Sequence, residues 1–120
     1  MSLDVSLIRK RQISYDEGKT YIPDEEQVYW ANITHNLGEM AAEAGIYQAL
    51  WRPEEIGATK AKDIIDVVEL GLTDMKARPE FYEQFNASNG WGLYKHFVPW
   101  VERYLEALKK FPEAEISVSR

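Results

Sequence analysis

Residues 89–111, NGWGLYKHFVPWVERYLEALKKF, constrain the fold of this chain more than any other stretch. After a Gly-Trp-Gly turn, apolar side chains recur at steps of three or four, which is typical of one face of an α-helix. This stripe consists of Tyr94, Phe97, Val98, Val101, Tyr104, Leu105, Leu108 and Phe111. Pro99 removes one backbone hydrogen bond and therefore predicts a bend, unless the helix begins only there. Eight of the fifteen aromatic residues lie within residues 81–104, which predicts the densest part of the core.

A second helix is predicted for residues 60–78. Its apolar stripe consists of Ala61, Ile64, Ile65, Val68, Leu72 and Met75. Val67 and Leu70 widen this stripe, so we expect the helix to be covered on more than one side. Pro79 ends it, because the residue before a proline is biased away from the helical conformation.

A third helix is predicted for residues 37–51, with Asn36 as its N-cap. Gly45 weakens this helix and predicts a kink or a close approach of another backbone. Short helical turns are expected at residues 52–57, where Pro53 suits the first helical position and Gly57 closes the turn, and at residues 80–85.

The remaining segments predict strands. Residues 4–15 have the pattern of a half-exposed edge strand, and a turn at residues 16–19 leads into a short return arm that Pro23 ends. Residues 28–34, VYWANIT, predict a buried strand, with a helix starting near residue 24 as the alternative. Residues 115–119 alternate apolar and polar side chains, which predicts a last strand beside the first.

The predicted fold is therefore a single α+β domain over residues 1–120. Three main helices pack on a small, mostly antiparallel sheet, which is made from the N-terminal hairpin, the strand at residues 28–34 and the C-terminal strand.

Charge and composition exclude several kinds of protein. The net charge is −6, which argues against a nucleic-acid binder that works through phosphate contacts. The chain has no cysteine, so disulfides, thiolate metal sites and a cysteine nucleophile are excluded. It has no apolar run of membrane-spanning length and no signal-peptide pattern. We expect a cytoplasmic protein that does not act at a membrane.

The first candidate site is the segment NITHN, residues 32–36. On a strand, Asn32 and Thr34 point to one face and His35 to the other. With Asn36, four hydrogen-bonding side chains stand where a strand meets a helix, and they predict a ligand site. The alternative is a network of caps and turns that only satisfies nearby backbone groups.

The second candidate site is the loop NASNGWGLY, residues 86–94. Gly90 and Gly92 flank Trp91, so the indole lies where the backbone can adopt unusual conformations. With Asn89, an exposed Trp91 predicts a stacking platform or an interface anchor. The alternative is that Trp91 folds into the core and the glycines only let the chain turn.

Other chemistry has little support in the sequence. His35 and His96 are the only histidines, and their spacing matches no metal motif, so neither a metal nor a cofactor is expected. No G-x-S-x-G or phosphate-binding glycine motif is present, so no catalytic residue is assigned.

Residues 32–36 (NITHN), residues 89–94 (NGWGLY) and the closing Val118-Ser119-Arg120 resemble motifs of small uncharacterised proteins of bacteriophages, prophages and some bacterial genomes. The resemblance covers the chain from about residue 28 to its end. It carries no established activity. It implies a compact accessory protein that acts inside a bacterial cell by binding a host or phage partner.

These patterns favour a non-enzymatic interaction protein whose tryptophans, above all Trp91, Trp100 or Trp51, bind an unknown protein partner or a second copy of the chain. The second hypothesis is a small-ligand-binding protein or cryptic enzyme, with a polar pocket between residues 32–36 and residues 86–92. The two motifs must then meet in space. A third option, an acidic mimic of nucleic acid, is opposed by the mixed charges of the last helix.

Overall fold

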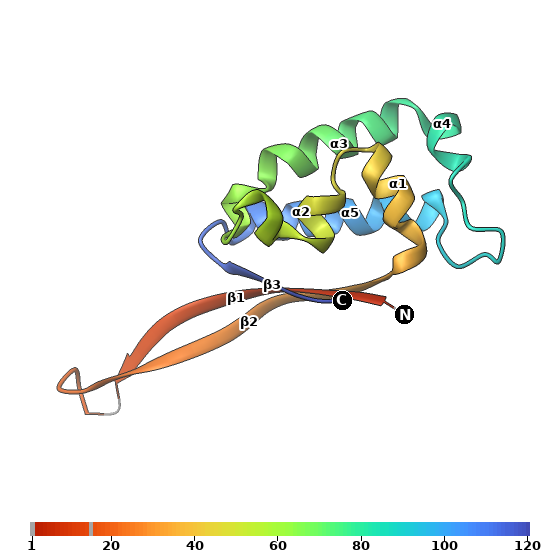
Figure 1. Cartoon of the computed structure of the whole chain (residues 1–120). Helices are drawn as coiled ribbons and strands as arrows, with labels where there is room; N and C mark the ends of the chain where they lie inside the picture. The colour runs from red at the N-terminus through yellow and green to blue at the C-terminus, as the bar shows by residue number, and fades with distance from the viewer. Residues whose placement is uncertain (1, 15) are drawn as a thin grey trace.

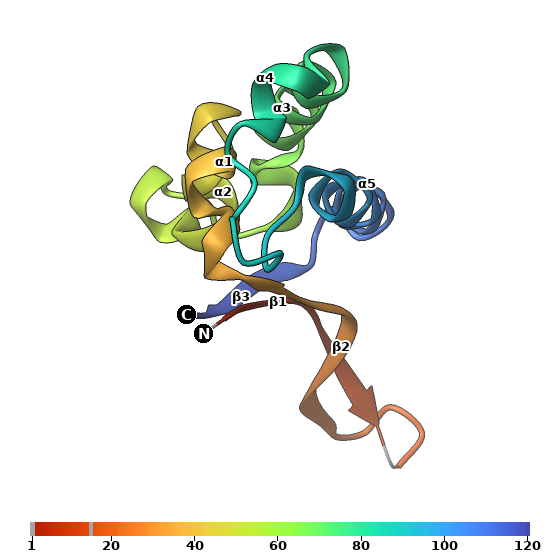
Figure 2. The ribbon, with the colours of Figure 1, turned by 90° about the vertical axis from the view of Figure 1, so that its right-hand side faces the viewer.

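The sheet consists of three antiparallel strands, and all the helices lie on one face of it (Figure 1, Figure 2). The computed structural model describes residues 2–14 and 16–120, so Tyr15 of the predicted first strand lies outside the described residues. β1 (Ser2–Ser14) lies between β2 (Tyr21–Thr34) and β3 (Glu115–Ser119). The α+β fold predicted from the sequence is confirmed, and so is the pairing of β3 with the N-terminal strand.

Three predictions about the strands were wrong. β1 is the central strand where β3 pairs with it, from Asp4 to Ile8, and not an edge strand. β2 does not end at Pro23 but continues through it, and Pro23 pairs with Gln12. Proline has no backbone N–H to donate. An edge strand accepts it where that position faces the open side, because no neighbouring strand needs a donor there. The strand predicted at residues 28–34 is the second half of β2, and the helical alternative is excluded. The strand is not buried as predicted, because Trp30 is 56 % exposed and Ile33 alone among these residues is buried.

β1 and β2 continue beyond the rest of the sheet as a two-stranded arm, which lengthens the molecule to 59 Å against 27 and 24 Å in the other directions (Figure 1). Leu7 pairs with Tyr29 and Ile8 with Gln27, so Val28 is an extra residue on β2. Such a bulge increases local twist and bends the strand pair. The bulge lies where the pairing with β3 ends, so the arm departs from the body there.

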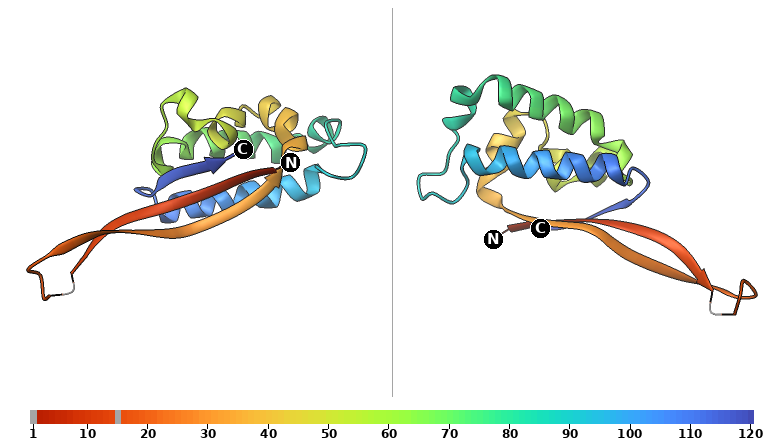
Figure 3. Two further views of the ribbon diagram at one scale, coloured as in Figure 1. Left: turned by 60° about the horizontal axis from the view of Figure 1, so that its bottom comes forward. Right: turned by 180° about the vertical axis from the view of Figure 1, so that it is seen from behind.

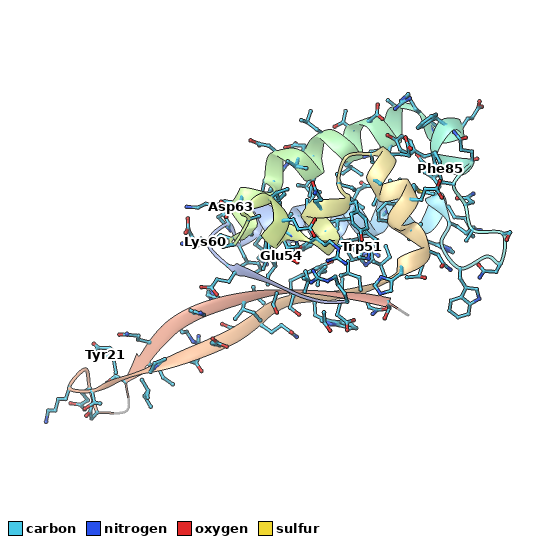
Figure 4. The ribbon with its side chains drawn as sticks, in the orientation of Figure 1. Tyr21, Trp51, Glu54, Lys60, Asp63 and Phe85 are labelled. Carbon is cyan, nitrogen blue, oxygen red and sulfur yellow. The ribbon has the colours of Figure 1, made fainter. Side chains whose placement is uncertain are left out.

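The arm is held by ion pairs between its own strands. Arg9 pairs with Glu26, and Arg11 pairs with Asp24 at 2.7 Å. These exposed pairs contribute little each, but they satisfy the charges of a ribbon that faces water on both sides. Tyr21 lies near the tip of the arm with 57 % of its surface exposed (Figure 4).

Two long helices form the core with the inner face of the sheet. α3 (Ile65–Ala77) and α5 (Tyr94–Lys110) lie side by side and run antiparallel (Figure 3). The pairs Lys76–Glu102 and Lys109–Glu69, at 3.3 and 3.0 Å, connect their outer edges. α5 buries most of the predicted stripe, and Pro99 lies inside the helix. α3 is covered on one side only, since Leu70 is 73 % exposed, and the predicted second covered side was wrong.

The predicted helix at residues 37–51 is interrupted. A 3₁₀ turn, η1 (His35–Leu37), leads into α1 (Gly38–Glu43), and α2 (Tyr47–Trp51) follows after a turn. Gly45 has φ +77°, and the N–H of Ile46 donates to the carbonyl of Ala41 while that of Gly45 donates to Ala42. This is the Schellman arrangement that ends helices at a left-handed glycine.

The short turns join these elements. η2 (Pro53–Ile56) and α4 (Pro79–Glu83) are the short turns predicted at residues 52–57 and 80–85. η3 (Ala61–Asp63) precedes α3, and the Asp63 carboxylate accepts the backbone N–H of Lys60 at 2.9 Å. Lys60 and Asp63 lie together at this end of the helical layer (Figure 4). Arg120 fixes the C-terminus by donating to the carbonyl of Trp51 at 2.8 Å.

Tyr104 of α5 has a hydroxyl group that is buried and has no hydrogen-bond partner in the described part of the chain. Its ring stacks on Tyr29 at 5.9 Å, and burial raises the pKa of Tyr104 above its ordinary value. A buried unpaired hydroxyl costs roughly 1–3 kcal/mol. We expect Tyr104→Phe to raise the free energy of unfolding by about 1 kcal/mol in denaturant titration. A loss of stability would contradict this and would mean that the hydroxyl has a partner.

Tyr82 of α4 is the opposite case, because its hydroxyl donates to the carboxylate of Asp74 on α3. Burial and this hydrogen bond raise the pKa of Tyr82 from its ordinary value of about 10 to about 12. The pKa of Tyr82 is higher in the folded than in the unfolded state. The protonated hydroxyl therefore stabilises the folded state fully below pH 10, and this contribution is lost as the pH rises through 12. We expect the free energy of unfolding of the wild-type protein to fall between these two pH values, and to fall less in Tyr82→Phe. An equal loss in both proteins would remove Tyr82 as its source.

Candidate functional site

A pocket of about 850 Å³ lies where the end of β2 meets the loop before α5. All six residues predicted as ligand-binding from the sequence line this pocket: Asn32, Thr34, His35, Asn36, Asn89 and Trp91. The two motifs are more than fifty residues apart in the chain, and the structure brings them together. The spatial condition that the pocket hypothesis set is therefore met.

The two motifs are joined by direct contacts. The side-chain amide of Asn36 donates to the carbonyl of Trp91 at 2.8 Å. A Cβ atom added to Gly92, which has φ +124°, would lie 3.0 Å from the Cβ of Asn36. The absence of a side chain at Gly92 therefore permits the loop to lie against residue 36. Asn36 does not cap the helix as predicted, because the N-cap position of α1 is Leu37, which makes no side-chain cap bond. Thr34 caps the preceding 3₁₀ turn η1, and its hydroxyl accepts the N–H of Asn36 at 3.2 Å.

The loop at residues 86–93 is fixed by its own hydrogen bonds. The side-chain oxygen of Asn89 accepts the N–H of Trp91 at 2.9 Å, and that of Asn86 accepts the N–H of Tyr94 at 2.7 Å. The N–H of Ala87 donates to the carbonyl of Gly92 at 3.0 Å. Trp91 is 71 % exposed. The loop thus holds an indole in the solvent at the edge of the pocket, and the alternative of a core residue is wrong.

His35 is positioned by a tryptophan from α2. The indole N–H of Trp51 donates to Nδ1 of His35 at 2.9 Å, and Trp51 itself is buried and stacks on Tyr47 at 5.3 Å. Because Nδ1 accepts this hydrogen bond, the neutral imidazole carries its proton on Nε2. His35 lines the pocket, and its Nε2–H is not used by Trp51.

Asn32 contributes mainly to the structure of the wall. Its side-chain amide donates to Ser2 at 2.9 Å and to Asp4 at 2.5 Å, across the β1–β2 pair. Its backbone carbonyl accepts the indole N–H of Trp100 at 3.0 Å. The alternative interpretation holds in part: Thr34 caps η1 and Asn36 satisfies the backbone carbonyl of Trp91, whereas the side chain of Asn32 bonds to side chains of β1. All three residues also line the pocket.

α5 supplies three lining residues that the sequence analysis did not assign to the site: His96, Trp100 and Arg103. Their spacing of four and three residues places them on one stripe of the helix, next to the apolar stripe. Trp100 is 7 % exposed, whereas His96 and Arg103 are exposed. The signal was present in the sequence, because Trp100 is a large aromatic residue outside the predicted apolar stripe.

Comparison with protein-family models, curated proteins and solved structures finds no match. The site therefore has to be interpreted from its own chemistry. Within residues 2–14 and 16–120, no three His, Asp or Glu side chains cluster as metal ligands, and no helix is both long and apolar enough to span a bilayer.

The charge of the pocket differs from that of the chain. Arg103, His96 and His35 line it, and no Asp or Glu is among its described lining residues. The chain as a whole has 20 acidic residues and a net charge of −6. The pocket combines cationic and N–H donor groups with two indole rings, an arrangement suited to holding a ligand by hydrogen bonds, charge and stacking.

Proposed function

We propose that this chain is a non-enzymatic binding protein whose recognition site is the pocket between residues 32–36 and residues 89–92. The observation that carries the proposal is the exposed Trp91, which a hydrogen-bonded loop fixes at the edge of a pocket. Exposed aromatic residues in fixed positions are typical anchors of protein interfaces, because they bury a large area at a small cost in conformational entropy.

The proposed occupant is a segment of a protein partner or of a second copy of the chain, with Trp91 as its anchor. The resemblance of the two motifs to small phage and prophage proteins supports this setting, in which an accessory protein acts in the bacterial cytoplasm on a host or phage protein. Trp30, 56 % exposed on the outer face of the sheet, is a second exposed aromatic residue on a different surface.

The alternative is a small-ligand-binding protein or cryptic enzyme that uses the same pocket. Its support is the size of the pocket, about 850 Å³, which lies in the range of about 300–1,000 Å³ typical of small-molecule sites. Under this alternative, His35 and the amides of the wall orient the ligand.

The test compares Trp91→Ala with Trp30→Ala as a matched control, since both remove an exposed indole. We expect affinity capture from bacterial lysate, together with sedimentation of the purified protein, to show a partner or self-association that Trp91→Ala abolishes and Trp30→Ala retains. Loss with Trp30→Ala and retention with Trp91→Ala would place the interface on the open sheet and overturn the proposal. Retention in both variants would also overturn it.

A further inference from the structure

Arg103 differs from the other arginines of the chain. Arg9, Arg11, Arg52, Arg78 and Arg120 each form an ion pair with a carboxylate. In the described part of the chain, no carboxylate oxygen lies within 4 Å of the Arg103 guanidinium, although the chain has six more acidic than basic residues. An arginine without a counter-ion in an acidic protein keeps its full capacity for an external anion.

Arg103 lies in the pocket next to other groups that favour negative charge. His96 is seven residues earlier, on the same stripe of α5, and His35 lines the pocket from η1, with Nδ1 bound by Trp51 and Nε2 left for another partner. The acidic residues nearest to Arg103 in the chain are Glu102, which pairs with Lys76 of α3, and Glu106, one turn beyond. Asp4, on β1, accepts from Asn32. None of these three carboxylates lines the pocket. Because no carboxylate among the described lining residues opposes the charge of Arg103, the concave site favours an anion.

The two tryptophans of the pocket differ, because Trp100 is buried and Trp91 presents an exposed ring. The indole N–H of Trp100 is already used by the carbonyl of Asn32. The backbone N–H and carbonyl of Trp91 are bound by Asn89 and Asn36, which leaves the exposed ring for contacts. An indole face favours a planar group, which stacks with an offset or meets it edge to face.

We infer that the pocket selects a negatively charged ligand with a planar ring. Arg103 and His96 bind its carboxylate or phosphate group, His35 donates a hydrogen bond from Nε2, and Trp91 covers the ring. This inference rests on the proposed function, since it specifies what the same pocket recognises. The source of the ring and the anion is either a free small molecule or an equivalent group at the end of a peptide chain.

The test uses benzoate and benzamide, which share size and shape but differ in charge. Titration of the isotope-labelled protein by NMR follows the backbone amides of Trp91, Gly92 and His96. We expect benzoate to shift these amides with an affinity at least about five-fold higher than that of benzamide, the amount that one charge-assisted hydrogen bond contributes at a partly exposed site. A peptide ending in phenylalanine, compared with its C-terminal amide, tests the macromolecular source in the same way.

Arg103→Gln should remove the preference for benzoate over benzamide. Lys95→Gln is the matched control, because it removes the same charge from the same helix at an exposed residue that does not line the pocket. We expect Lys95→Gln to retain the preference, and the amide spectrum of each variant shows whether it is folded. A preference that Arg103→Gln leaves unchanged would overturn the role of Arg103.

The outcomes separate this inference from the proposed function. Equal affinities for benzoate and benzamide at the pocket would overturn anion selectivity and leave the pocket as a binding site. No shifts with any probe, but a partner lost in Trp91→Ala, would overturn the planar-anion ligand and retain partner binding. No shifts and a partner retained in Trp91→Ala would overturn both.

Discussion

Gly71→Ala is expected to lower the free energy of unfolding by about 2–4 kcal/mol, although alanine is the better helix former by about 1 kcal/mol. A Cβ atom at position 71 would lie 2.3 Å from Cγ2 of Ile46 and 2.8 Å from the carbonyl oxygen of Ala44. Ile46 is fully buried, and the carbonyl belongs to a turn fixed by helix-ending hydrogen bonds. Neither atom can move without displacing α3 from the turn between α1 and α2.

The measurement is denaturant unfolding of Gly71→Ala beside Leu70→Ala. Leu70 precedes Gly71 on the same helix but is 73 % exposed, so its substitution changes helix propensity without a clash. We expect Leu70→Ala to change stability by less than about 0.5 kcal/mol. A stable Gly71→Ala variant would mean that α3 does not pack against residues 44–46 as closely as the structure shows.

The contact at Gly71 also explains why one predicted helix was divided. Residues 37–51 have a nearly continuous apolar stripe, and periodicity alone predicts one helix. The chain turns at Gly45, and α3 packs closely against this turn at Gly71. The helix propensity of residues 37–51 does not show that another helix, α3, packs against them.

The strands also show what local sequence patterns can and cannot predict. The alternation at residues 115–119 and the β-branched residues of residues 28–34 predicted two strands, and both are present. Pro23 alone predicts a strand end, because a proline breaks a ladder in the middle of a sheet. Whether a strand is central or at an edge depends on the order of all the strands, and in this fold β2 is at the edge.

The site was predicted in part for a physical reason. Clusters of Asn, Thr and His at a strand end, and a Trp between glycines, are local patterns that a sequence displays directly. His96, Trp100 and Arg103 are spread over α5, and only the position of the apolar stripe identifies their shared face. The contact between residues 32–36 and residues 89–92 depends on the tertiary structure, so the sequence does not show it.

Gly92→Ala is expected to disconnect the two halves of the site. Gly92 has φ +124°, a conformation that L side chains rarely adopt, and an added Cβ would lie 3.0 Å from the Cβ of Asn36. The strain and the contact together should lower the free energy of unfolding by about 2–3 kcal/mol. Relief of the contact moves the loop away from Asn36, and the hydrogen bond from Asn36 to the carbonyl of Trp91 is lost.

Gly90→Ala is the matched control for this loss. Gly90 also has a positive φ, +78°, but a Cβ added there meets no atom within 4 Å. It therefore carries the cost of the left-handed conformation, about 1 kcal/mol, without the contact. We expect the side-chain amide resonances of Asn36 and the partner or ligand affinity of the pocket to change strongly in Gly92→Ala and only slightly in Gly90→Ala. If the two variants lose equal stability and retain equal binding, the approach of Gly92 to Asn36 does not build the site, and the pocket is held together by the ends of β2 and α5 alone.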